Sequence, residues 1–215
     1  MSIDANTQKL IDKIERADNA TRMVDAVRDL ADNATIAATD TLIKVLAYNN
    51  PGAAVAAVDG LIAIGEPAVE PLLQELDGYN YGARAWAIRA LAGIGDPRAL
   101  NILLEAATED FALSVRRGAA RGLGTVLWDK MASQEVLESQ KQVLKTLIQV
   151  CQDPEWVVRY AAVSGLEALG MVFKQSQPEL AWQVMEKLRQ IQEEETEIAV
   201  KVRSQSGIQQ LSQLT

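Results

Sequence analysis

The sequence predicts an all-α protein built as an α-solenoid, which is an array of stacked helix pairs. Three observations predict this architecture. A degenerate repeat runs along most of the chain, each repeat holds two segments with one apolar or small-residue face, and no segment shows the two-residue alternation of a strand. The chain has 215 residues, of which 48% are hydrophobic and 23% charged, so it can bury a core and is not disordered.

The repeat is clearest in the expected second helix of each pair. Five segments align: AAVAAVDGLIAIG from Ala53, ARAWAIRALAGIG from Ala83, VRRGAARGLGTVL from Val115, VRYAAVSGLEALG from Val158 and VKVRSQSGIQQL from Val200. Their second position, here called the repeat position, holds Ala54, Arg84, Arg116, Arg159 or Lys201. Six residues later comes Gly or Ala, which is expected to let two helix backbones approach closely.

An apolar segment that is expected to form the first helix precedes each of these. These segments start at Thr41, Val69, Ala99, Gln142 and Ala181. Residues 8–17 and 21–31 are expected to be two helices that cap the array. We therefore expect about five helix pairs resembling HEAT repeats in a single domain over 1–215, with a cap over 1–34, core repeats over 35–170 and a C-terminal repeat or cap over 171–215.

Acidic residues stand six positions before the basic residue of three repeats. They are Asp110, Asp153 and Glu195, which precede Arg116, Arg159 and Lys201. In HEAT-like repeats such acids cap the second helix and pair with that basic residue, so we expect structural caps here and not catalytic carboxylates. The acidic run 193–195 is expected to be a solvated turn between helices.

Composition excludes several kinds of chemistry. The chain has no histidine, so Ser-His-Asp and Cys-His nucleophiles and His-ligated metals are excluded. Its one cysteine, Cys151, ends an apolar helix, where a buried thiol is expected and a nucleophile is not. The net charge of −8 opposes nucleic-acid binding. With no signal peptide at the amino terminus and no apolar stretch long enough to span a membrane, a cytoplasmic protein without a membrane or metal site is expected.

Two windows of this acidic chain, residues 78–95 and 111–128, contain no acidic residue at all. Helical geometry places the residues one, two and five positions after the repeat position opposite the core, on the face that lines the concave surface of HEAT-type arrays. Those positions hold Trp86, Arg89, Arg117, Arg121 and Tyr160. Aromatic rings and guanidinium groups on one surface suit a flat, conjugated ligand that carries carboxylates.

The turn at residues 77–82 is expected beside that surface and carries Asp77, Tyr79, Asn80 and Tyr81. The sequence is compatible with two roles for these four residues, contact with a ligand and a purely structural role. In the structural alternative the tyrosines stack between adjacent repeats, the asparagine makes turn hydrogen bonds, and the exposed arginines are simply solvated.

Four stretches of the chain resemble the F-type subunit of the heterodimeric E/F-type phycobilin lyases, in particular those that act on the phycocyanin α subunit. They are LAYNNPGAAVAAVDGLIAIGEPAV, DGYNYGARAWAIRALAGIGDPRAL, DFALSVRRGAARGLG and QDPEWVVRYAAVSGL. The resemblance covers most of residues 42–170, and GYNYGARAW is its most specific part.

This resemblance implies a lyase subunit that works with an E-type partner. The family attaches phycocyanobilin, a linear tetrapyrrole, to a cysteine of the phycocyanin α subunit through a thioether bond. The bilin is then a substrate, and no permanently bound cofactor is expected. Because the acceptor protein supplies the nucleophile, the lyase would act mainly by holding and orienting the bilin.

On this hypothesis the bilin site combines the arginines with the aromatic residues. Arg89, Arg117 and Arg121 would bind the propionates, and Trp86, Tyr79, Tyr81 and Tyr160 would stack on pyrrole rings, with Asn80 in the same turn. Asp77 would accept hydrogen bonds from pyrrole N–H groups or donate a proton. Two alternatives remain open: a non-enzymatic HEAT-repeat scaffold or chaperone for phycobiliproteins, and a factor that detaches bilin or helps to degrade the phycobilisome.

Overall fold

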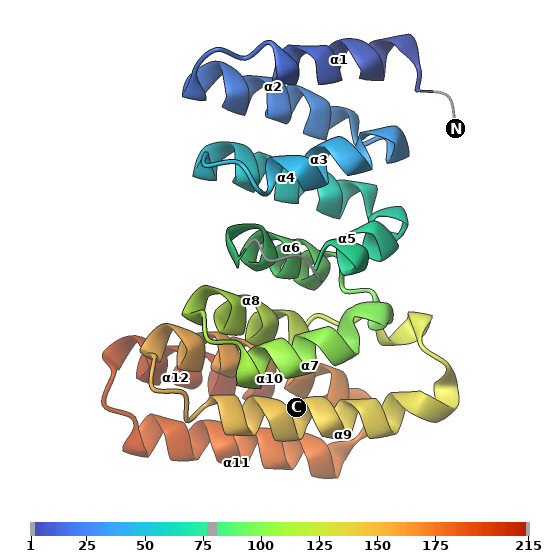
Figure 1. The fold of residues 1–215 in the computed structure, drawn as a ribbon. Coiled ribbons are helices and arrows are strands. Elements are labelled where there is room, and N and C mark those ends of the chain that lie inside the picture. The colour runs from blue at the N-terminus through green and yellow to red at the C-terminus, as the bar shows by residue number, and fades with distance from the viewer. Residues whose placement is uncertain (1–2, 77–80, 214–215) are drawn as a thin grey trace. The chain divides into compact units, whose positions relative to one another are not determined.

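The computed structural model describes residues 3–76 and 81–213, and every regular element in these ranges is a helix (Figure 1). The first helices of the pairs are α1 (Ala5–Glu15), α3 (Thr39–Val45), α5 (Val69–Glu75), α7 (Leu100–Glu109), α9 (Ser133–Val150) and α11 (Pro178–Glu194). The second helices are α2 (Ala20–Asn33), α4 (Pro51–Ile64), α6 (Tyr81–Ile94), α8 (Leu113–Leu123), α10 (Trp156–Ser176) and α12 (Ile198–Ser212). The expectation of an all-α array of helix pairs is therefore confirmed, and the N-terminal cap is itself a pair.

The chain divides into two compact units, Met1–Ala99 and Leu100–Thr215, and each is described by itself. The expectation of a single domain, with its inner boundaries at residues 34 and 170, stays a prediction. Short 3-10 helices precede three of the first helices, at Ile36–Ala38, Glu66–Ala68 and Pro97–Ala99, and a fourth lies at Trp128–Lys130.

In the first unit, α2 packs against α4 and α4 packs against α6. A β-carbon added at Gly60 of α4 would lie 2.7 Å from the β-carbon of Ala31 on α2, so this small residue does permit a close approach. Helix α4 starts where it does because Asn50 caps it: the Asn50 side chain accepts the Ala53 N–H at 3.1 Å, and Pro51 follows at the first helical position.

Glycine is needed at the turns that end two second helices of the first unit. Gly65 and Gly95 follow α4 and α6 with φ of +73° and +72°, which is the left-handed region that other residues rarely adopt. Each glycine is followed two residues later by a proline, Pro67 or Pro97, in the 3-10 turn. The same backbone turn therefore ends both α4 and α6.

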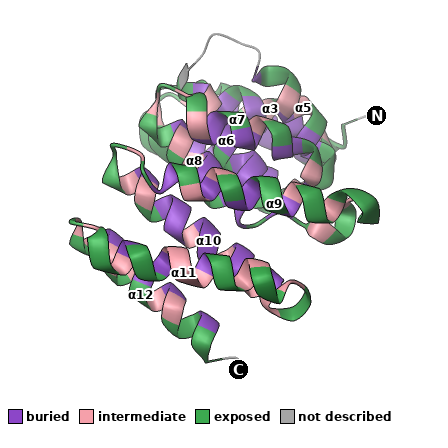
Figure 2. Cartoon of the chain, turned by 90° about the horizontal axis from the view of Figure 1, so that it is seen from below, coloured by how far each residue is buried: buried purple, intermediate pink, exposed green. Residues whose placement is uncertain are grey.

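In the second unit, α10 occupies the centre and packs against α8, α9, α11 and α12, and Figure 2 shows it largely buried. A β-carbon on Gly165 would lie 2.7 Å from the main-chain oxygen of Ala120 on α8. Among the described residues, α10 is the single helix that is long and apolar enough to cross a membrane, and 56% of that stretch is buried inside the protein; α4 and the segment after it pass the same test only together, across a bend of 118°.

The core face of the second helices lies opposite the positions that the helical pattern assigned to the exposed face. Residues one before and three, seven and ten after the repeat position are buried in α6 and α10 and along the α8 segment. They are Ala83, Ala87, Leu91 and Ile94, then Val115, Ala119, Leu123 and Val126, then Val158, Ala162, Leu166 and Leu169. The opposite faces of these helices are consequently the ones available to a ligand or a partner.

Candidate functional site

Two arginines at the repeat position tie successive helix pairs of the second unit together. Arg116 donates through Nη1 to the main-chain oxygens of Asp110 and Phe111, and through Nε and Nη2 to the Asp153 carboxylate at 2.7 and 3.1 Å. Arg159 donates in the same way to the main-chain oxygens of Asp153 and Pro154, and to the Glu195 carboxylate at 2.7 and 2.9 Å. We call these two bidentate pairs the arginine ladder.

The expected pairing of an acid with the basic residue six positions later is therefore wrong for Asp153 and Glu195. Asp153 and Glu195 pair with the arginine of the preceding repeat. The physical reason is that Nη1 of each arginine is held by carbonyl groups of the turn before its own helix, which leaves the other edge of the guanidinium to the next turn.

The expected helix caps are also placed differently. Asp110, Asp153 and Glu195 accept the N–H of the residue two positions on, which is the N-cap residue itself and not a residue of the first turn. The solvated turn expected at 193–195 is wrong as well, because α11 continues through Glu194 and Glu195 is in the ladder.

The ladder shifts the ionisation of its carboxylates. Hydrogen bonds from Arg159 lower the pKa of Glu195 from 4.5 to about 2. Burial alone would raise the pKa of Asp153, but hydrogen bonds from Arg116 and from the Glu155 N–H hold it below its usual value. Both groups are thus carboxylates at neutral pH, which agrees with a structural role and gives neither a proton to donate.

Cys151 is buried, as the sequence predicts, and burial raises the pKa of its thiol to about 12. The thiolate is the reactive form of cysteine, so this residue is not a nucleophile at physiological pH. A covalent intermediate on Cys151 is therefore not part of the chemistry that this chain performs.

We expect Cys151 in the native protein to react with a thiol reagent such as DTNB at pH 8 at least ~100-fold more slowly than free cysteine, because little thiolate forms and the sulfur is buried. Urea should restore the ordinary rate. Since the chain has one cysteine, absorbance of the released thiolate reports this site alone. A native rate equal to that of free cysteine would contradict the burial.

In the first unit the structure brings Trp86 and Arg89 together on α6. The guanidinium carbon of Arg89 lies 5.7 Å from the centroid of the Trp86 ring, which is a cation–π distance. Arg89 is exposed and Trp86 is half-buried. Asp77, Tyr79 and Asn80 lie outside the described residues; Tyr81 starts α6, and its side chain is likewise outside the description.

In the second unit Arg117 and Arg121 lie one turn apart on α8 and are exposed, and Tyr160 is exposed on the adjacent α10. Within the described ranges neither arginine has an ion-pair partner, unlike their neighbour Arg116. Arg117 and Tyr160 occupy the same place in their repeats, one residue after the repeat position. The structure therefore places these three side chains on one face of two packed helices, while Trp86 and Arg89 belong to the other unit.

Sequence reasoning missed three exposed residues of the same face, located three positions before the repeat position. These are Leu113, Trp156 and Ile198. Each lies one helical turn before the residue that follows the repeat position, which is Arg117, Tyr160 or Val202. The signal that could have found them is the i, i+4 relation on a helix, because it puts Trp156 directly beside Tyr160.

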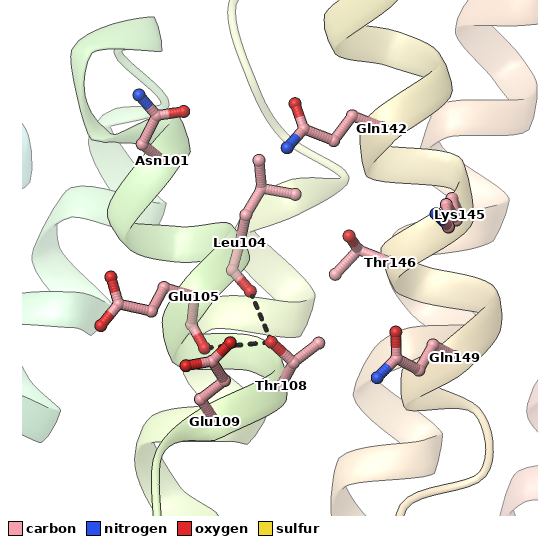
Figure 3. A pocket seen from close by; sticks show the side chains of 9 residues that line it. All are labelled: Asn101, Leu104, Glu105, Thr108, Glu109, Gln142, Lys145, Thr146 and Gln149. Atoms are coloured by element: carbon pink, nitrogen blue, oxygen red, sulfur yellow. Dashed lines mark hydrogen bonds between the residues drawn. The ribbon is translucent and has the colours of Figure 1, made fainter.

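A polar cleft of about 370 Å³ lies between α7 and α9 (Figure 3). It is lined by Asn101, Leu104, Glu105, Thr108 and Glu109 of α7 and by Gln142, Lys145, Thr146 and Gln149 of α9. Thr108 donates its hydroxyl to the main-chain oxygens of Leu104 and Glu105, so it is already occupied. None of the residues selected from the sequence lines this cleft. Among the described residues, no group of three or more Cys, Asp or Glu side chains could hold a metal ion.

Comparison with known proteins places this architecture in a family. Profiles described as HEAT repeats match residues 39–124 and 69–139, and a HEAT repeat profile matches 143–173. The chain is 55% identical over 162 residues to "Phycocyanin alpha phycocyanobilin lyase CpcF" of Synechocystis sp. (strain PCC 6803), covering 75% of this chain and 76% of that protein. It is 51% identical over 205 residues to the "Phycobilisome maturation protein" of Synechococcus elongatus, covering 95% and 97%.

A solved structure agrees with the sequence comparison. A chain in "The structure of the complex of CpcE and CpcF of phycocyanin lyase" from Nostoc sp. PCC7120 matches with a TM-score of 0.73 and 44% identity, covering 80% of this chain and 99% of that one. Identity at this level over three quarters or more of each protein goes well beyond a shared HEAT-repeat fold. The chain belongs to the family of F-type subunits of the phycocyanobilin lyases.

Proposed function

We propose that this chain is one subunit of a heterodimeric phycobilin lyase, which binds phycocyanobilin and attaches it by a thioether bond to a cysteine of the phycocyanin α subunit. The observation that carries the proposal is the 55% identity to a protein named as a phycocyanin α phycocyanobilin lyase. The match to a chain of a CpcE–CpcF complex supports an E-type subunit as the partner. The bilin is the substrate, no cofactor stays bound, and the complex works in the cytoplasm.

The proposed reaction requires no covalent bond between the bilin and this chain. The acceptor thiolate adds to the ethylidene group of the bilin A ring, and the proton is delivered elsewhere on the tetrapyrrole, so no atom is lost. The buried, protonated Cys151 takes no part in this addition. Catalysis then rests on holding a flexible bilin in one conformation next to the acceptor cysteine.

We assign the propionates to the exposed arginines, because guanidinium groups bind carboxylates with charge-assisted hydrogen bonds. Arg117 and Arg121 are one turn apart on α8, and Tyr160 on the packed α10 can stack on a pyrrole ring. In the first unit, Trp86 and Arg89 are a separate aromatic–cationic pair on α6, which we propose as a bilin contact in its own right. Asp77, Tyr79, Asn80 and Tyr81, which precede that pair in the sequence, stay proposed bilin contacts on the basis of the sequence alone.

Co-expression tests the function directly. This chain is produced with the phycocyanin α subunit and a phycocyanobilin pathway, with and without the E-type partner, and covalent bilin is read by zinc-enhanced fluorescence in a denaturing gel. We expect bilin on the α subunit only when both lyase subunits are present. A soluble complex that attaches no bilin would contradict the proposed lyase function. If the complex instead released bilin from mature phycocyanin and did not load the apo-protein, it would be a detaching factor.

The double variant Arg117→Gln/Arg121→Gln is expected to weaken bilin binding by the lyase complex about 10- to 100-fold, because two charge-assisted contacts are lost. Binding is measured by the change in visible absorbance of free phycocyanobilin, and helical circular dichroism should be unchanged. The control is Arg22→Gln/Arg189→Gln, which alters two exposed arginines on α2 and α11. Unchanged bilin binding together with lost E-type association would reassign these arginines to the partner.

A further inference from the structure

Exposed apolar side chains recur near the starts of the second helices of the second unit. Leu113 on α8, Trp156 on α10 and Ile198 on α12 all stand three residues before the repeat position, and Val202 lies one turn after Ile198. We call these four residues the apolar row. Ile198 and Val202 are 74% and 58% exposed, and Trp156 is 44% exposed, which is unusual for residues that normally enter a core.

The helices that carry the row pack on one another, α8 against α10 and α10 against α12, and the three leading members share one place in the repeat. Packed helices lie about 8–10 Å apart, so three of them present a row about 20 Å long. About 13 residues of α-helix have that length. The row therefore matches one amphipathic helix of a partner lying across α8, α10 and α12.

The residues of the row and its surroundings favour a protein over a small conjugated ligand. Aliphatic Ile198 and Val202 offer no ring to stack on, whereas an exposed tryptophan is enriched at the centres of protein interfaces. The row itself contains no charged side chain. Glu155 and Glu197 come directly before Trp156 and Ile198 on one flank, while Arg117 and Arg121 follow on the other.

We infer that the apolar row is the docking site for the acceptor protein, which inserts one amphipathic helix with basic side chains facing Glu155 and Glu197, while Arg117 and Arg121 on the other flank hold the bilin. The identity of this occupant rests on the proposed function. Arg117 and Tyr160 are each one turn from a member of the row, Leu113 and Trp156. A helix docked on the row lies beside the proposed bilin contacts, so docking brings the acceptor cysteine to the bound bilin.

The test uses the complete lyase, this chain with its E-type partner, and apo-phycocyanin α subunit as the probe. The variant Trp156→Gln/Ile198→Gln removes two members of the row. The matched control Trp182→Gln/Leu137→Gln makes the same kind of change at exposed residues of the first helices α11 and α9. Val202→Gln is an independent second variant. Acceptor affinity is measured by titration calorimetry, bilin binding by absorbance, and subunit association by size-exclusion chromatography.

We expect the row variant to bind the acceptor at least ~10-fold more weakly, with bilin binding and E-type association within twofold of the unaltered complex. The control should bind like the unaltered complex, and Val202→Gln should show a smaller loss in the same direction. Unchanged acceptor affinity in the row variant would overturn the inference while leaving lyase activity, and thus the proposed function, intact. If the row variant lost E-type association or bilin binding while its acceptor affinity was unchanged, the row would be the binding surface for the E-type subunit or for the bilin. Failure of the unaltered complex to bind the acceptor or attach bilin would overturn both proposals.

Discussion

The variant Gly165→Ala is expected to lower the free energy of unfolding by about 2–3 kcal/mol. The added methyl group would lie 2.7 Å from the main-chain oxygen of Ala120 and 2.9 Å from Cδ2 of Leu147. A backbone oxygen cannot rotate away, so α8 and α10 must separate, which outweighs the roughly 1 kcal/mol that alanine gains over glycine in a helix.

Urea denaturation followed by circular dichroism measures this loss. The control Gln175→Ala lies near the end of the same helix at an exposed position, and its effect should stay within about 0.5 kcal/mol. A Gly165→Ala protein as stable as its parent would show that the two helices are not held in backbone contact.

Arg159→Met is expected to cost about 3 kcal/mol at pH 7, because it removes a bidentate partner from a Glu195 carboxylate whose side chain is only 9% exposed. The pH dependence has a definite sign. The pKa of Glu195 is about 2 in the folded protein against an ordinary 4.5, so the stabilisation is complete above about pH 4.5 and disappears as the pH falls toward 2. The difference in the free energy of unfolding between the parent and the variant should therefore shrink below pH 4.

The matched control is Arg189→Met. Arg189 donates to Glu186 at the same distance of 2.7 Å, but these side chains are 55% and 44% exposed. An exposed pair contributes little, so the control should lose less than about 0.5 kcal/mol and show almost no pH dependence. If both variants lost the same free energy of unfolding at pH 7, burial would not strengthen the ion pairs of the ladder.

The repeat pattern was enough to predict the helix pairs and their core face, because both follow from local periodicity. Small residues six positions after the repeat position also predicted close backbone approach, which Gly60 and Gly165 confirm. The direction of the arginine ladder could not be predicted in this way. Arg116 and Asp153 are 37 residues apart, and their pairing depends on how one helix pair stacks on the next.

The candidate site was predicted only in part, for a related reason. The helical pattern placed Arg117, Arg121 and Tyr160 on one face away from the core, and all three are exposed; their contact with a bilin stays a prediction. It overlooked Trp156 and Ile198, because apolar residues near a helix start are ordinarily assigned to the core. Only the burial of the folded chain separates an exposed isoleucine from a core one.

The arginine ladder also determines how the second unit comes apart. Each guanidinium is bonded at once to the turn before its own helix and to the turn of the following pair, so no pair can leave without breaking the attachment of its neighbour. Because of this coupling between neighbouring helix pairs, we expect the pairs of the second unit to unfold as one cooperative unit. Amide hydrogen exchange in α8 and in α12 should then report similar opening energies, and the last pair should not fray ahead of the rest.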